Sequence, residues 1–339
     1  MKVLLFDTTS AFLTPGGKTT HALKLQKEIS KLGVDIQFYR WWDQSQADCD
    51  IIHFLANEPR IAQLAHTRGI KCFLSQIFDF ESNKTEFEKK KTILKNRIVN
   101  KLPGLLSASA YWKSFQYMDC IQFMHKYDYE TALRYFPKEL GDKKKIIIPH
   151  AYAPDDMNIG KYLNIKEMNL PEKYLVSVAN ISTRKQTVLL ARYAKQAKVP
   201  IVFMGSKNDN DPYFQKFKTE IDNKYVFYPG YVSKEWRDCI ESHASGYVLL
   251  SLGESGCIAV YEAAAYKIPL LLSNLPWAWG YDNPTDIYFC DQQDEKKAIQ
   301  QLQKFYNLSG KMDHTPFKIQ SWGEVAKMYI KQYSELLMS

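Results

Sequence analysis

The sequence has no long hydrophobic run. None of its apolar stretches approaches the roughly 20 residues that a membrane-spanning helix needs. Residues 1–6 turn polar too soon for a signal peptide, so we expect a first β-strand there. The six cysteines are scattered without a Cys-x-x-Cys pair, which argues against a disulfide framework and against a zinc site. These absences indicate a cytoplasmic protein with free thiols.

The composition indicates a soluble chain with more than one domain. A length of 339 residues exceeds one ordinary core and fits two domains of about 150 residues each. Apolar residues make up 45% and charged residues 24%, as in globular proteins. The net charge of +8 permits a nucleotide, a nucleic acid or a membrane surface as an anionic partner. No recognition motif accompanies the basic residues, so we expect no nucleic-acid partner.

Short apolar runs alternate with helical segments along the chain, which predicts an α/β fold with parallel sheets. A polar stretch at 154–170 separates two halves. We therefore expect a first domain at 1–153 and a second at 171–320. The strands are predicted at 1–7, 48–55, 69–75, 118–125, 145–150, 174–179, 199–205, 224–232, 246–250, 269–272 and 285–290.

Residues 246–273 contain two carboxylates eight positions apart. A buried strand, a turn, a helix that stops before Pro269 and a second strand predict one crossover of a parallel sheet. Ligands bind beyond the carboxyl ends of such strands, where Glu254 would lie in the turn and Glu262 about two helical turns further. Carboxylates accept hydrogen bonds from vicinal hydroxyls, which fits a sugar. Two ordinary surface glutamates are the alternative.

Two further segments are candidate anion sites. Arg184 and Lys185 lie where a strand gives way to a helix N-terminus, and two cations beside a positive helix end attract an anion. Gly16 and Gly17 precede a helix predicted over 19–32, where free backbone amides could receive a phosphate. A solvated basic turn and a plain glycine turn are the alternatives.

These motifs resemble the E-x7-E element of the retaining glycosyltransferases of the GT-B type, glycosyltransferase family 4, also described as glycosyl transferases group 1. The resemblance extends over nearly the whole chain. It implies an α/β fold with two Rossmann-like, doubly wound domains that face a central cleft. A terminal Ser-Trp helix at 321–339 would complete the first, acceptor-side domain. The implied reaction transfers a sugar from a nucleotide-diphosphate sugar, without a metal or another cofactor.

The family's roles fall on matching positions of this sequence. The first Glu contacts the donor sugar and the second binds the ribose, which assigns these roles to Glu254 and Glu262. An Arg and a Lys neutralise the diphosphate. Lys185 matches the Lys, whereas Asn180 stands where the Arg is usual, so Arg184 would take its place. The donor-binding candidates are Gly16, Gly17, Asn180, Gly205, Ser255, Gly256, Cys257 and Glu262.

The sequence also departs from the family. Residues 254–257 read Glu-Ser-Gly-Cys where Glu-Gly-Phe-Gly is usual, so the sugar selected can differ. His53 resembles the family's strand-end His and is expected to face the cleft. Asp79 is a second possible cleft residue. It follows Phe78 where many members have His-Asp, so that His contact is expected to be missing. An inactive nucleotide-sugar-binding regulatory or scaffold protein is therefore the alternative function.

Residues 84–101 combine seven basic side chains with Ile93, Leu94, Ile98 and Val99 at helical spacing. The pattern is typical of an amphipathic helix on an anionic membrane, and also of a helix whose apolar side packs in the core. Many enzymes resembling this one act on lipid-linked acceptors. We therefore expect a glycan or lipid-linked acceptor, a role in bacterial surface polysaccharide or glycan biosynthesis, and peripheral contact with the inner face of the membrane.

Overall fold

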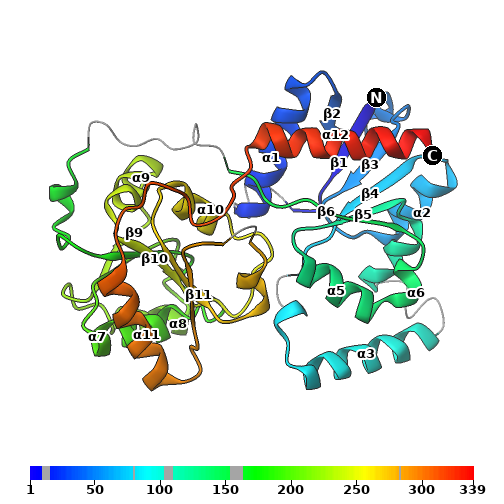
Figure 1. Cartoon of the computed structure of the whole chain (residues 1–339). Coiled ribbons are helices and arrows are strands. Elements are labelled where there is room, and N and C mark those ends of the chain that lie inside the picture. Colours follow the sequence, from blue (N-terminus) through cyan, green and yellow to red (C-terminus); the bar gives the residue numbers. More distant parts are fainter. Residues whose placement is uncertain (10–15, 79–80, 103–109, 153–162, 282–283) are drawn as a thin grey trace. The chain divides into compact units, whose positions relative to one another are not determined.

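The computed structural model describes residues 1–9, 16–78, 81–102, 110–152, 163–281 and 284–339 (Figure 1). The predicted site residue Asp79 lies outside the described residues, as does the first half of the expected linker. The chain divides into two compact units, Met1–Ala151 with Gln320–Ser339, and Tyr152–Ile319. Each unit contains its own six-stranded sheet. The predicted α/β class is confirmed.

The first sheet is parallel and has the order β2-β1-β3-β4-β5-β6. Its winding reverses at β1, which has β2 on one side and β3 on the other, as in a doubly wound fold. The strands are β1 (Lys2–Phe6), β2 (Asp35–Phe38), β3 (Ile51–Phe54), β4 (Lys71–Ser75), β5 (Cys120–Phe123) and β6 (Lys144–Ile147). The helices and 3-10 turns of this unit are α1 (Gly17–Lys31), η1 (Gln44–Gln46), α2 (Pro59–Thr67), η2 (Glu81–Asn83), α3 (Glu86–Lys101), η3 (Tyr111–Tyr117), α5 (Lys126–Tyr135), α6 (Pro137–Leu140) and α12 (Trp322–Met338).

Local sequence signals set the helix starts. Thr85 and Glu88 form a capping box at the start of α3, and Ser321 and Glu324 form another at the start of α12. Each box satisfies backbone N–H groups that a helix start leaves without partners. The Ser-Trp helix expected at the carboxyl end thus begins at Trp322, and it lies alongside α1 in the first unit (Figure 1).

Buried polar side chains hold α12 against the sheet. His53 of β3 is fully buried, with Nδ1 2.7 Å from the Tyr333 hydroxyl and Nε2 2.7 Å from the Ser75 hydroxyl. Tyr329 donates to Oε1 of Gln122 at 3.1 Å. Burial lowers the pKa of His53 to about 3, so the ring is neutral. The expectation that His53 faces a cleft is wrong, because both ring nitrogens serve the packing of α12.

The second sheet has the order β12-β11-β10-β7-β8-β9, and its strand pairs are parallel. The predicted crossover is present, since α10 connects the neighbouring parallel strands β10 and β11. The strands are β7 (Leu175–Val178), β8 (Ile201–Met204), β9 (Val226–Gly230), β10 (Gly246–Leu249), β11 (Leu270–Ser273) and β12 (Ile287–Cys290). The helices and 3-10 turns are η5 (Ile165–Met168), α7 (Thr187–Ala197), α8 (Pro212–Lys218), α9 (Lys234–His243), α10 (Ile258–Ala265), η6 (Pro276–Trp279) and α11 (Glu295–Leu308).

The central strands of this sheet are buried on both faces, which explains their continuous apolar sequence. Each fully buried Leu or Val contributes roughly 1.5–3 kcal/mol. Toward α9 and α10 the strands present Val176, Val178, Val202, Met204, Tyr247, Leu249, Leu270 and Leu272. Toward α7, α8 and α11 they present Leu175, Ile201, Phe203, Val248, Leu250 and Leu271.

The winding of the second sheet reverses at β7, which has β10 on one side and β8 on the other. Loops that leave such neighbouring strands diverge, and the space outside their carboxyl ends is where α/β sheets bind ligands. The two predicted charged motifs follow β7 and β10. Within the described part of the chain, no helix has both the length and the apolarity to span a bilayer.

Candidate active site

Two loops meet at the switch point of the second sheet. One follows β7 and ends at Gln186, whose left-handed backbone (φ 53°) precedes α7. The other follows β10 and leads into α10. The backbone N–H of Leu252 donates to the carbonyl of Arg184 at 2.9 Å, which joins the two loops directly. Side chains from both loops are therefore held close together.

Three donors converge on one carboxylate oxygen. Oε1 of Glu254 accepts from Nη1 of Arg184 at 2.8 Å, from Nζ of Lys185 at 2.7 Å and from the Ser251 hydroxyl at 2.5 Å. Glu254 and Lys185 are only 7% and 8% exposed, whereas the Arg184 side chain is 35% exposed. Two cations and one anion leave this cluster with a net positive charge. It is thus a partly desolvated site that favours an anion.

A second set of bonds fixes the loop after β10. The carbonyl of Ser251 accepts from the Ser273 hydroxyl at 2.7 Å and from Nε1 of Trp277 at 3.0 Å. The exit of β10 is therefore tied to the end of β11 and to η6. The roles of Ser251, Ser273 and Trp277 were not predicted, although Ser251 stands only three residues before Glu254.

Glu262 lies in α10 and is 8% exposed. Its Oε1 accepts from Nη2 of Arg237, a residue of α9, at 3.0 Å. Nε of Arg237 lies 3.9 Å from Oε2 of Glu241, which is fully buried. Burial and the charge of Glu262 raise the pKa of Glu241 well above its usual value, which favours its protonated form. Sequence reasoning missed Arg237 and Glu241, whose i, i+4 spacing in α9 was the available signal.

Gly205 lies at the carboxyl end of β8 with φ +152°. A Cβ atom there would lie 2.1 Å from the carbonyl oxygen of Ala179, so only glycine fits. Next to it, the Ser206 hydroxyl donates to Oδ1 of the exposed Asn180 at 2.7 Å. Gly205 thus permits the close approach of the backbones that leave β7 and β8.

The other three residues of the altered motif, residues 255–257, differ in how accessible they are to a ligand. Ser255 is half-buried, and its hydroxyl oxygen has no hydrogen-bond partner among the described residues. Gly256 is half-buried as well. Cys257 is buried at the N-cap of α10, and burial raises the pKa of its thiol to about 12. The thiol is therefore neutral near pH 7 and is a poor nucleophile.

Gly16 and Gly17 are exposed at the start of α1. The helix begins at Gly17, two residues earlier than predicted, and Gly16 is its N-cap without a side-chain capping bond. No acidic residue lies in the first turn. An uncapped helix start favours an anion, because the first amide groups and the helix dipole are both positive.

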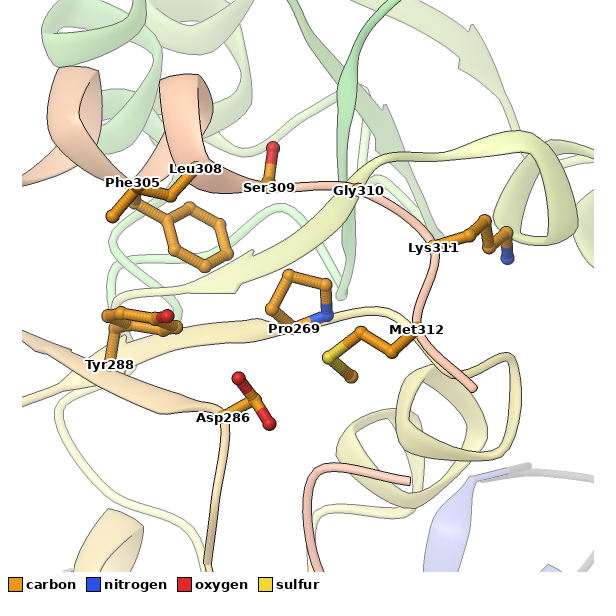
Figure 2. A pocket seen from close by; sticks show the side chains of 9 residues that line it. All are labelled: Pro269, Asp286, Tyr288, Phe305, Leu308, Ser309, Gly310, Lys311 and Met312. Atoms are coloured by element: carbon orange, nitrogen blue, oxygen red, sulfur yellow. The ribbon is translucent and has the colours of Figure 1, made fainter. Parts of the chain in front are cut away.

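A cavity lies at the opposite edge of the second sheet (Figure 2). Pro269 and Asp286, which line it, immediately precede β11 and β12, so the cavity lies at the amino ends of these strands. The Lys311 side chain points away from the other labelled side chains (Figure 2) and donates to the carbonyl of Tyr266 at 2.9 Å. None of the predicted site residues lines this cavity.

Comparisons with solved structures agree with this fold. The sucrose-phosphate synthase from Thermosynechococcus elongatus has a TM-score of 0.71 at 12% identity, with 99% of each chain covered. An E. coli structure described as trehalose-6-phosphate bound with UDP-2-fluoro glucose has a TM-score of 0.65 at 12% identity, covering 99% of this chain and 94% of that one. Anabaena HepE, described in complex with UDP and glucose, has a TM-score of 0.61 at 11% identity, covering 99% and 100%. At these identities the likeness establishes the fold, which is GT-B.

Residues 159–315 match the family model described as glycosyl transferases group 1. No curated protein sequence matches the chain. Residues 159–315, which lie largely in the second unit, thus match a glycosyl transferases group 1 domain, and the chain has the GT-B fold that the E-x7-E resemblance implied.

Proposed function

We propose that the protein transfers a sugar, with retention of anomeric configuration, from a nucleotide-diphosphate sugar to a glycan or lipid-linked saccharide. The observation that carries the proposal is the cluster of Arg184, Lys185 and Glu254 at the switch point of the second sheet. The UDP and UDP-sugar named for two of the solved structures with this fold support a nucleotide-sugar donor.

The cluster contains the charges that such a reaction needs. Negative charge builds on the diphosphate as the sugar leaves, and fixed cations offset it. When the donor binds, Lys185 and Arg184 exchange part of their contact with Glu254 for phosphate oxygens. The exposure of the Arg184 side chain makes this exchange possible without rearranging the core. Glu254 then accepts hydrogen bonds from the donor sugar.

Glu262 is proposed to accept from the ribose hydroxyls. Arg237 orients the buried Glu262 carboxylate through the bond at 3.0 Å and places a positive charge beside it. The other donor contacts that we propose are Ser255, Gly256, Cys257, Asn180 and Gly205 in the second unit, and the amides at Gly16 and Gly17 in the first.

We propose that no metal or other cofactor takes part. Arg184 and Lys185 already supply two positive charges at one carboxylate, which matches the charge that a departing diphosphate develops. Transfer should therefore persist in excess EDTA. Loss of activity with EDTA that Mg²⁺ restores would overturn this part of the proposal.

The acceptor side of the proposal rests on α3. Ile93 and Val99 pack against the core of the first unit, whereas Leu94 and Ile98 are 59% and 54% exposed. Phe87 is 67% exposed on the same helix. Exposed apolar side chains among lysines suit an anionic lipid surface. We propose peripheral contact with the inner face of a membrane, a cytoplasmic location and a role in bacterial surface polysaccharide or glycan biosynthesis.

A thermal-shift screen tests the donor first. Uridine, guanosine and adenosine diphosphates and their sugars are compared, since a ligand that binds only the folded state raises the melting temperature. Transfer is then measured with the matching donor, with Lys185→Ala as the variant. We expect one nucleotide class to stabilise the wild type and Lys185→Ala to lose transfer. Binding without turnover on any acceptor would instead favour a nucleotide-sugar-binding protein without catalysis.

A further inference from the structure

Two neighbouring tryptophans are exposed in the loop after β2. Trp41 is 81% exposed and Trp42 is 66% exposed. Their ring centroids lie 5.6 Å apart and their planes meet at 88°. An indole normally contributes to folding by being buried, whereas most of the surface of both of these side chains is exposed. Exposed tryptophans of this kind are enriched where a protein binds a ligand or a partner.

Hydrogen bonds within residues 38–46 order the loop that carries the two tryptophans. Arg40 donates through Nε to Oδ2 of Asp43 at 2.9 Å, and Asp43 in turn accepts from the backbone N–H of Ser45 at 3.0 Å. Gln46 is 4% exposed, accepts from the backbone N–H of Arg40 at 2.8 Å and donates to the carbonyl of Phe38 at 3.0 Å. The turn is thus ordered before any ligand arrives, which lowers the entropic cost of binding.

The loop also lies on the ligand-binding side of the sheet. Trp41 and Trp42 follow the carboxyl end of β2, which pairs in parallel with β1. The exposed Gly16 and Gly17 follow β1 and therefore belong to the same edge. Ligands of doubly wound sheets bind outside the carboxyl ends of the strands.

The charge around the indoles selects the kind of ligand. The guanidinium of Arg40 is paired with Asp43, so the turn offers no excess of positive charge. It differs in this respect from the lysine-rich α3, and it has no attraction for an anionic lipid surface. A neutral pyranose ring suits it, because one face of the ring is lined by C–H groups that stack on an indole. The hydroxyl groups at the ring edge stay in water.

We propose that Trp41 and Trp42 form a stacking platform for neutral pyranose rings of the acceptor saccharide. The two perpendicular indoles would contact two faces of a bent oligosaccharide. This assignment rests on the proposed glycosyltransferase function and adds the chemical class of acceptor to it.

The test uses the full chain and soluble neutral oligosaccharides, maltotriose and mannotriose, as probes. Binding is followed by tryptophan fluorescence and by saturation-transfer NMR. We expect binding to the wild type and a loss of affinity of about tenfold or more in Trp41→Ala and Trp42→Ala, as for other tryptophan contacts. Trp41→Phe and Trp42→Phe should keep most of the affinity, because a phenyl ring still stacks.

Leu64→Ala, which truncates a 58% exposed side chain of α2, is the matched control and should bind like the wild type. The thermal shift with nucleotide diphosphates should be the same in all variants. Unchanged saccharide affinity in both alanine variants, or no binding of either probe to the wild type, overturns the platform. Loss of phosphatidylserine-vesicle binding in the alanine variants, with saccharide affinity intact, overturns it in favour of a membrane anchor. Absence of any nucleotide shift in the wild type, with saccharide binding present, refutes the proposed function and leaves the platform standing.

Discussion

Replacing Glu254 by Gln should lower the stability of the ligand-free protein and raise its affinity for a nucleotide diphosphate. The substitution keeps the shape and removes the charge that Arg184 and Lys185 share. Removing one partner of a fully buried ion pair costs about 3–5 kcal/mol. The Arg184 side chain is 35% exposed, and Lys185 keeps the amide oxygen as an acceptor, so we expect about 1–3 kcal/mol here. For a unit of this size that corresponds to a fall in Tm of about 2–12 °C.

The diphosphate would supply the missing countercharge. In the wild type it must compete with the Glu254 carboxylate for the same two cations. A unit charge about 4 Å away is worth about 4 kcal/mol at an effective dielectric constant of 20, and solvent rearrangement offsets much of this. We therefore expect the variant to bind the diphosphate about 5–30-fold more tightly, equivalent to about 1–2 kcal/mol, while transfer is lost.

Differential scanning fluorimetry with and without UDP, GDP and ADP checks this expectation, together with calorimetric Kd values for the nucleotide that binds. Glu220→Gln is a matched control, because Glu220 accepts from Nε of Arg192 at 2.9 Å and from Lys195 in the same unit. That control should lose stability without any gain in nucleotide affinity. A nucleotide-induced shift in Glu254→Gln that equals the wild-type shift, or falls below it, would refute the competition between carboxylate and phosphate.

Three further outcomes are expected. Gly205→Ala places a methyl group 2.1 Å from the carbonyl oxygen of Ala179. Thermal unfolding should therefore show that the free energy of unfolding falls by at least about 3 kcal/mol. A Tm within 2 °C of the wild-type value would contradict the close approach. Burial lowers the pKa of His53 to about 3, below its unfolded value of 6.5. The contribution of the neutral ring to the free energy of unfolding is therefore complete above pH 6.5, and it falls by up to about 1.4 kcal/mol for each pH unit below pH 6.5. Urea unfolding at pH 7 and pH 5 should show a smaller pH dependence in His53→Gln than in the wild type. Leu94→Asp with Ile98→Asp should abolish binding to phosphatidylserine vesicles in a sedimentation assay and leave the nucleotide shift unchanged, whereas intact vesicle binding would remove the membrane role of α3.

Much of the fold could be predicted because most of its strands are recognisable in the sequence. Strands buried on both faces read as continuous apolar runs, and the predicted run at 246–250 became β10. The strand β2 was not predicted, since Asp35–Phe38 is short and contains alternating polar residues at a sheet edge. The helix α9 was not predicted either, because its buried face includes Asp238 and Glu241, and charged residues are usually expected on the solvent-exposed face.

The site was predictable as far as it depends on chain order. Arg184 and Lys185 follow one strand and Glu254 follows another, and the parallel sheet brings these two strand ends together. The i, i+4 spacing could have paired Arg237 with Glu241, but its contact with Glu262 could not be predicted, because only the packing of α9 against α10 directs it there. His53 shows the opposite error. A histidine at a strand end looks functional in sequence, and the side of the strand on which it lies decided that it packs under α12.

A crystal structure with bound nucleotide diphosphate is the most direct measurement. We expect the phosphate oxygens within hydrogen-bond distance of Nζ of Lys185 and of the Arg184 guanidinium, with the ribose hydroxyls on Glu262. A diphosphate bound at the amino ends of β11 and β12, or one that leaves both cations on Glu254, would contradict the account.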